Sequence, residues 1–144
     1  MPTDQTNATM RRRRFDRRPE EVAAARRFVV SSLVRGSEAW ETAQLLVSET
    51  VTSSLDRSGP DSGSGTLEVG YALDTRRLLV EVSDDGGPAR LRRRIHDAGP
   101  AKGHGLELVQ ALASRWGVRE SSAGRTIWFE VDLTGRAGRA HKTS

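Results

Sequence analysis

The hydrophobic periodicity of this chain first changes from helical to alternating after about residue 55, and the place of that change limits the folds that the chain can adopt. Before residue 56, apolar residues recur at intervals of three and four, which predicts amphipathic helices. After the Gly- and Ser-rich stretch 58–65 they alternate with polar residues, which predicts strands. A chain of 144 residues can bury one core but not two. The sequence therefore predicts one domain in which helices pack on a sheet.

Turn and capping residues divide this pattern into elements. Pro19 and the two glutamates after it open a first helix that Gly36 ends, and Ser37 caps a second helix that runs to about Leu55. Phe15 either begins an edge strand or leads into the first helix. The order predicts an α+β two-layer sandwich, with about three helices on one face of a mixed sheet of four to five strands. The later predicted elements are strands at 67–71 and 78–84, a helix at 105–115, and strands at 116–120 and 126–133.

The two ends of the chain are basic and lack periodicity. We predict a disordered basic tail over residues 1–14, the folded domain over 15–134 and a flexible tail over 135–144. The net charge is +4, yet the stretch 38–85 is acidic, so the positive charge is concentrated in arginine runs. The first run has no interleaved aromatic residue apart from Phe15, which leaves nucleic-acid binding as the least supported function.

Composition excludes several classes of protein. The chain has no cysteine, which rules out disulfides and thiolate metal sites. No apolar run approaches the roughly 20 residues that span a bilayer, and the first residues lack the apolar core of a secretion signal. We therefore expect a cytoplasmic protein that makes no membrane contact.

Polar residues interrupt the apolar pattern of the second predicted helix. Glu49, Ser53 and Arg57 are four residues apart, so they form a polar row beside the apolar stripe through Val47 and Val51. A solvated helix face explains this row from spacing alone. The alternative is a row of side chains that lines a pocket.

A carboxylate ends the strand at 78–84 on the side that should be buried. Asp84 has the same parity as Val80 and Val82, so it points inward, where a carboxylate without a hydrogen-bonding partner is costly. Gly86 and Gly87 follow, and they leave the backbone open to a ligand. An Asx-type turn explains the sequence Asp-Asp-Gly-Gly equally well.

Two glycines flank His104 at the start of the last predicted helix. Backbone N–H groups at a helix start form an anion site, most often for phosphate, and Gly103 and Gly105 keep them accessible. The plain alternative is an ordinary helix start with an exposed histidine.

Together these segments resemble the GHKL ATPase superfamily, whose members include gyrase, histidine kinases and MutL. Within it, the chain is similar to the small bacterial anti-sigma-factor serine/threonine kinases. The resemblance implies a Bergerat-type ATP-binding fold. It covers most of the chain, from about residue 24 to 131, and rests on motifs in the family's order at 45–54, 80–86, 103–109, 113–118 and 124–129.

The resemblance also implies a role for each unusual residue. Glu49 would be the general base that polarises the attacking hydroxyl or water. Asp84 would accept a hydrogen bond from the adenine amino group, with Gly86 against the base and Thr126 on the adenine side. Residues 87–102 would cover the triphosphate as a lid. The other residues implied to bind the cofactor are Ser53, Arg57, Gly103, His104, Gly105 and Leu106.

Two departures from the family pattern concern metal and phosphate. Ser53 stands where the family has an asparagine that ligates Mg²⁺, and its shorter side chain would need a water to reach the ion. The second motif ends Gly86-Gly87-Pro88 instead of Gly-x-Gly, and proline removes one N–H from the hinge of the lid. ATP binding is therefore better supported than Mg²⁺ binding or catalysis.

The function implied by the resemblance is regulation of transcription. The protein would bind ATP and either hold a sigma factor or phosphorylate a small antagonist protein, with kinase activity weakened or lost through Ser53. Whether it is an active serine/threonine protein kinase stays open here. The alternative is a non-catalytic interaction module with a degenerate nucleotide pocket. Related regulators are often homodimers, and no residue pattern in this chain fixes its oligomeric state.

Overall fold

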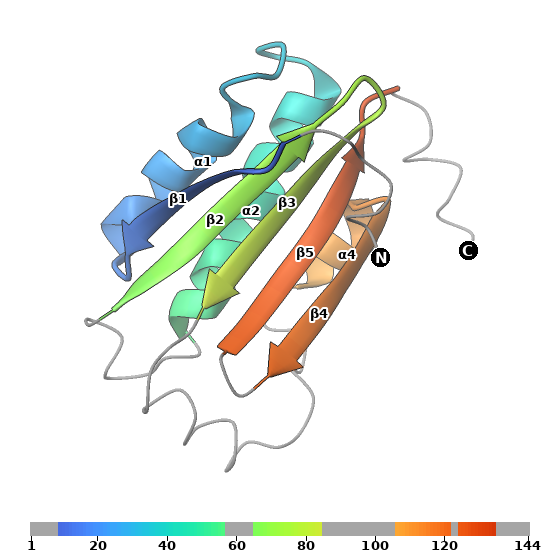
Figure 1. The fold of residues 1–144 in the computed structure, drawn as a ribbon. Helices are drawn as coiled ribbons and strands as arrows, with labels where there is room; N and C mark the ends of the chain where they lie inside the picture. The colour runs from blue at the N-terminus through green and yellow to red at the C-terminus, as the bar shows by residue number, and fades with distance from the viewer. Residues whose placement is uncertain (1–8, 57–64, 85–105, 122–123, 135–144) are drawn as a thin grey trace.

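In the computed structural model, three α-helices cover one face of a five-stranded sheet (Figure 1). The described residues are 9–56, 65–84, 106–121 and 124–134. This arrangement confirms the predicted α+β two-layer sandwich. In chain order the elements are β1 (Arg11–Asp16), η2 (a 3-10 turn, Pro19–Glu21), α1 (Val22–Val30), α2 (Glu38–Asp56), β2 (Thr66–Leu73), β3 (Arg77–Asp84), α4 (Glu107–Leu112), β4 (Arg115–Ser121) and β5 (Gly124–Asp132).

The described strands pair only in antiparallel fashion, whereas the sequence predicted a mixed sheet. The described strands run in the order β1-β2-β3-β5-β4, and every neighbouring pair is antiparallel. The expected parallel component is missing from these pairs because β5 lies between β3 and β4, the two strands that α4 connects. The return strand of the last hairpin takes the place beside β3, with Leu78 opposite Val131.

The N-terminal arginine run is part of the sheet. Residues 11–14, which the sequence placed in a disordered tail, pair with β2 at positions 71 to 68. Phe15 is the buried residue of this strand, and its ring packs edge-on against Phe28 of α1 at 6.0 Å between centroids. Ladder hydrogen bonds and this aromatic contact hold β1 in place, so the folded region begins before residue 15.

Helix α2 matches its predicted range, whereas the first and last helices are shorter than predicted. Pro19–Glu21 form a 3-10 turn, so α1 begins at Val22. Ser37 caps α2, because its Oγ accepts the Trp40 N–H at 3.1 Å. The first helix ends at Val30 instead of continuing to Gly36, whose φ of 83° is left-handed. The last helix is shorter than predicted, since Ala113 is extended and the chain then enters β4. No helix in the described part of the chain is long and apolar enough to cross a membrane.

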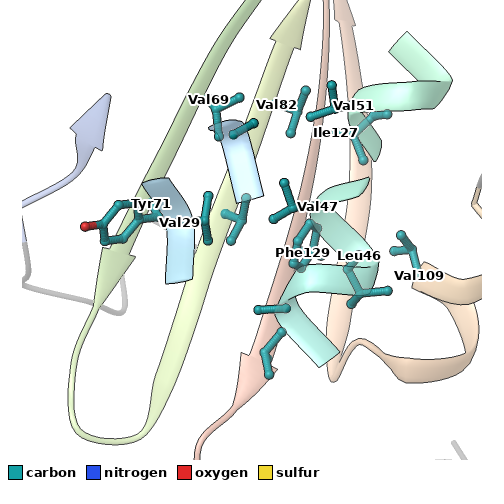
Figure 2. Packing of buried hydrophobic residues seen from close by; sticks show 14 of the residues in the cluster. Val29, Leu46, Val47, Val51, Val69, Tyr71, Val82, Val109, Ile127 and Phe129 are labelled. Atoms are coloured by element: carbon teal, nitrogen blue, oxygen red, sulfur yellow. The ribbon is translucent and has the colours of Figure 1, made fainter. Parts of the chain in front are cut away.

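The core lies between the helices and the inner face of the sheet (Figure 2). The predicted stripe on α2 is confirmed, since Val47 and Val51 are buried and point toward the strands. Leu46 lies on the side of α2 that faces Val109 of α4 (Figure 2). The strands contribute the residues of one parity, among them Val69, Tyr71, Val80, Val82, Ile127 and Phe129.

Two consecutive leucines of α2 offer a test of this packing. Leu46 is fully buried, whereas Leu45 is 49% exposed. We expect Leu46→Ala to lower the free energy of unfolding by about 2–5 kcal/mol, because it leaves a cavity between α2 and α4. Leu45→Ala should change it by no more than about 0.5 kcal/mol. Urea unfolding followed by circular dichroism measures both values, and equal losses would contradict the assigned orientation of α2.

Candidate functional site

The side chain of Asp84 lies on the sheet face that the helices cover. It is 1% exposed and shares this face with Val80 and Val82. In the sheet Asp84 stands between Leu67 of β2 and Arg125 of β5. The inward direction predicted from strand parity is therefore confirmed.

Arg17 binds this carboxylate. Its Nη1 donates a charge-assisted hydrogen bond to Asp84 Oδ1, and both side chains are buried. Its Nη2 donates to the carbonyl oxygen of Ser54 at 3.2 Å. That carbonyl belongs to the last turn of α2, where backbone oxygens lack helical partners and a positive charge is favourable. One guanidinium thus joins the end of β3 to the end of α2.

Arg17 is a site residue that none of the sequence motifs indicated. A signal was nevertheless present in the parity of β1, because Arg17 is two residues after the inward-pointing Phe15. The chain keeps this direction after the strand ends, since the Arg17 N–H bonds to the Gly65 carbonyl at 3.3 Å. Within the arginine-rich segment, burial singles out this one side chain, while Arg11 to Arg14 and Arg18 are exposed.

Arg125 is a second buried arginine on the same face. It is 2% exposed, and its Nη2 lies 3.5 Å from the Ser53 Oγ of α2. Thr126, which the resemblance assigns to the adenine side, points to the opposite face, where its Oγ1 lies 2.9 Å from Ser83 Oγ. Strand parity therefore brings Arg125, and not Thr126, to the side of the sheet that holds Asp84.

The polar row of α2 turns inward toward the end of the helix. Glu49 is half-buried, whereas Ser53 and Ser54 are almost completely buried. A solvated helix face therefore does not account for Ser53. In the described region, one polar cluster forms where the ends of α2 and β3 meet the start of β5 and the residue that follows β1. It consists of Arg17, Ser53, Ser54, Asp84 and Arg125.

A Mg²⁺ site at Ser53 does not fit the described residues. Among them, no group of three or more His, Cys, Asp or Glu side chains could hold a metal ion. The Arg125 guanidinium also stands within hydrogen-bonding distance of the Ser53 hydroxyl. A fixed positive charge there opposes the binding of a divalent cation through this hydroxyl.

Several predicted site residues lie outside the described part of the chain. They are Arg57, Gly86, Gly103, His104 and Gly105, together with the segment 87–102 that was expected to form the lid. Leu106 is described, and it is buried in the core together with Val109 at the start of α4.

Comparison with known proteins identifies a domain over most of the chain. The model of the histidine kinase-like ATPase domain matches residues 15–131. This range includes the whole polar cluster and extends from β1 to β5. No curated protein shows significant similarity to the chain.

The buried ion pair leads to a prediction about stability. Arg17→Met leaves a buried carboxylate, and Asp84→Leu leaves a buried guanidinium, so each variant should lose about 3–5 kcal/mol of unfolding free energy. The double variant Arg17→Met/Asp84→Leu should lose clearly less than the sum, because it buries no unbalanced charge. Urea unfolding without nucleotide measures the three values.

A surface pair in β1 and β2 serves as the control for this cycle. Arg12 and Glu68 are 3.8 Å apart and partly exposed, so replacing Glu68 with Gln should cost no more than about 1 kcal/mol. Strictly additive losses at positions 17 and 84 would mean that the two side chains do not interact in solution.

Proposed function

Because the chain belongs to the histidine kinase-like ATPase domain family, we propose that it is an ATP-binding regulator of the anti-sigma-factor kinase type. Membership of this family implies ATP binding. The regulatory role goes further: the protein would act in the cytoplasm on transcription, by holding a sigma factor or by phosphorylating a small antagonist protein. Phosphoryl transfer would be weak or lost, because Ser53 and Arg125 together disfavour Mg²⁺.

The burial of Asp84 on the inner face is the observation that carries this proposal. A carboxylate is an acceptor of hydrogen bonds, and the exocyclic amino group of adenine is a donor. In the proposed complex Asp84 binds the base, and Glu49 on α2 is the general base of any residual phosphoryl transfer. The glycines at 86, 103 and 105 would contact the base and the phosphates.

The contact with Arg17 makes nucleotide binding a competition. Arg17 Nη1 already donates to Asp84 Oδ1, and in the proposed complex the adenine amino group takes the place of this donor. The exchange replaces a charged donor by a neutral one, and charge-assisted bonds are roughly twice as strong. We therefore expect the affinity for ATP to be reduced by the free energy that is needed to move Arg17.

The same contact favours a second function. An arginine of the chain itself satisfies the buried carboxylate, so the fold needs no nucleotide at this position. In that case the domain is a non-catalytic protein-interaction module whose partner binding is independent of ATP. The two functions differ in whether the base can displace Arg17.

A titration with ATP separates these functions. Arg17→Met keeps the carboxylate and removes its competitor, so we expect it to bind ATP at least about tenfold more tightly than the unmodified protein. The matched variant Arg17→Met/Asp84→Leu differs from it only in the carboxylate and should lose this binding. Calorimetry without Mg²⁺ gives the dissociation constants, with GTP as control, because guanine carries a carbonyl in place of the amino group.

Two results would count against the ATP proposal. Absence of ATP binding by both the unmodified protein and Arg17→Met would leave the interaction module. Equal binding by the two variants would show that the base does not depend on Asp84.

A change at position 53 tests the account of metal and catalysis. In the variant Ser53→Asn/Arg125→Thr, an amide oxygen replaces the hydroxyl and the nearby positive charge is gone. We expect Mg²⁺ to lower the dissociation constant for ATP at least about tenfold in this variant. We also expect slow hydrolysis of ATP to ADP to appear. Adding Glu49→Gln should abolish the hydrolysis and leave ATP binding intact. A variant that gains neither property would contradict the roles given to these residues.

A further inference from the structure

A cavity of about 670 Å³ lies at the end of the sheet opposite to Asp84. It is bordered by the connection between α1 and α2, the start of α2, the turn between β2 and β3, the end of α4 and the end of β5. Figure 1 shows the β2–β3 turn and the end of β3 at opposite ends of the molecule. None of the described residues assigned to the nucleotide lines this cavity.

Apolar side chains are exposed at the cavity. Val34 is 77% exposed and Leu112 is 38% exposed, and they are two of the four large hydrophobic residues that are exposed in the described part of the chain. Leu33, Leu73 and Leu133 also line the cavity. Exposed apolar residues that gather around a concave surface are typical of a contact site.

The charge of the cavity is opposite to that of the chain. Glu38, Asp74 and Asp132 line it, and no lysine, arginine or histidine is among the lining residues. The whole chain carries a net charge of +4. A negative cavity on a basic protein selects a cationic occupant, because complementary charge speeds correct association and penalises wrong partners.

Hydrogen bonds hold two of these carboxylates in place. Asp74 Oδ1 accepts the backbone N–H groups of Arg76 and Arg77 at 2.7 and 2.9 Å. Asp132 Oδ1 accepts the Thr134 N–H at 2.7 Å, and the Leu133 N–H bonds to the Arg76 carbonyl at 2.9 Å. The β2–β3 turn and the end of β5 are thereby fixed to one another. Binding of an occupant therefore costs little conformational entropy in this part of the rim.

We propose that this cavity is a docking site for a basic, apolar segment of a partner protein. Leucine-like side chains of that segment enter between Val34 and Leu112, and its lysines or arginines face the three carboxylates. Because the site shares no described residue with the polar cluster around Asp84, this docking does not require bound ATP.

Two other occupants, the chain's own C-terminal segment and a second copy of the chain, fit the cavity less well. The segment 135–144 follows the cavity rim directly and is basic, but it has no apolar side chain larger than alanine to fill the volume. A second copy of the chain exposes the arginines of β1, but Phe15, the apolar residue of that strand, is buried and cannot enter the cavity. Both remain as distinguishable outcomes of the experiment.

The experiment uses the full chain and a fluorescent peptide of alternating leucine and lysine blocks, with a glutamate-for-lysine peptide of the same length as comparison. We expect the lysine peptide to bind at least about tenfold more tightly than the glutamate peptide, as measured by fluorescence anisotropy. Its affinity should fall as the salt concentration is raised. Val34→Ser, Leu112→Ser and Glu38→Gln should each weaken it several-fold.

Matched variants control for nonspecific binding. Leu45→Ser and Val118→Ser change exposed apolar residues outside the cavity, and Glu107→Gln changes an exposed carboxylate of α4 outside it. These three should bind the lysine peptide like the unmodified protein. So should Arg17→Met/Asp84→Leu, which separates this site from the nucleotide proposal.

Four outcomes would overturn the proposal. They are the absence of peptide binding, equal binding of the two peptides, equal loss in cavity and control variants, and an effect of Arg17→Met/Asp84→Leu as large as that of the cavity variants. Tighter peptide binding after deletion of residues 135–144 would identify the chain's own segment as the occupant. A dimer in sedimentation that Leu112→Ser abolishes would identify a second copy instead.

Discussion

The buried ion pair between Arg17 and Asp84 joins parts of the molecule that no local interaction would bring together. Its members are 67 residues apart, and the second donor of Arg17 binds the last turn of α2 through the Ser54 carbonyl. A charged group in a low-dielectric interior is costly unless it is paired and hydrogen-bonded. The edge strand β1, the end of β3 and the end of α2 therefore depend on one another, and any ligand of Asp84 acts on all three.

The polar cluster around this pair differs from a site built for a metal-bound triphosphate. Two guanidinium groups, from Arg17 and Arg125, are buried close to the end of α2, where the helix dipole is negative. The charge of Arg17 is balanced by Asp84, whereas Arg125 lies beside the Ser53 hydroxyl. The arrangement is compatible with an anionic ligand and unfavourable to a divalent cation at Ser53.

The two ends of the sheet have contrasting chemistry. The end at Asp84 is buried, polar and rich in arginine, whereas the end at the β2–β3 turn has an open cavity with exposed apolar residues and three carboxylates. Helix α2 reaches both ends, with Glu38 at the cavity and Ser53 in the cluster. These two surfaces of one small domain share no described residue, so a ligand at one leaves the other accessible.

The sequence by itself determined the features that depend on residues close together in the chain. The change of period, the Ser37 cap and the parity of β3 predict the elements and the inward carboxylate of Asp84, because repeat and capping are local properties. The tertiary structure alone decided that β5 lies between β3 and β4, that Arg125 and not Thr126 shares a face with Asp84, and that Arg17 is its partner. Strand order is set by packing across the whole core. A one-residue shift in register moves each side chain of a strand to the other face of the sheet. The partner of a buried charge is set by where distant segments meet, which no local pattern records.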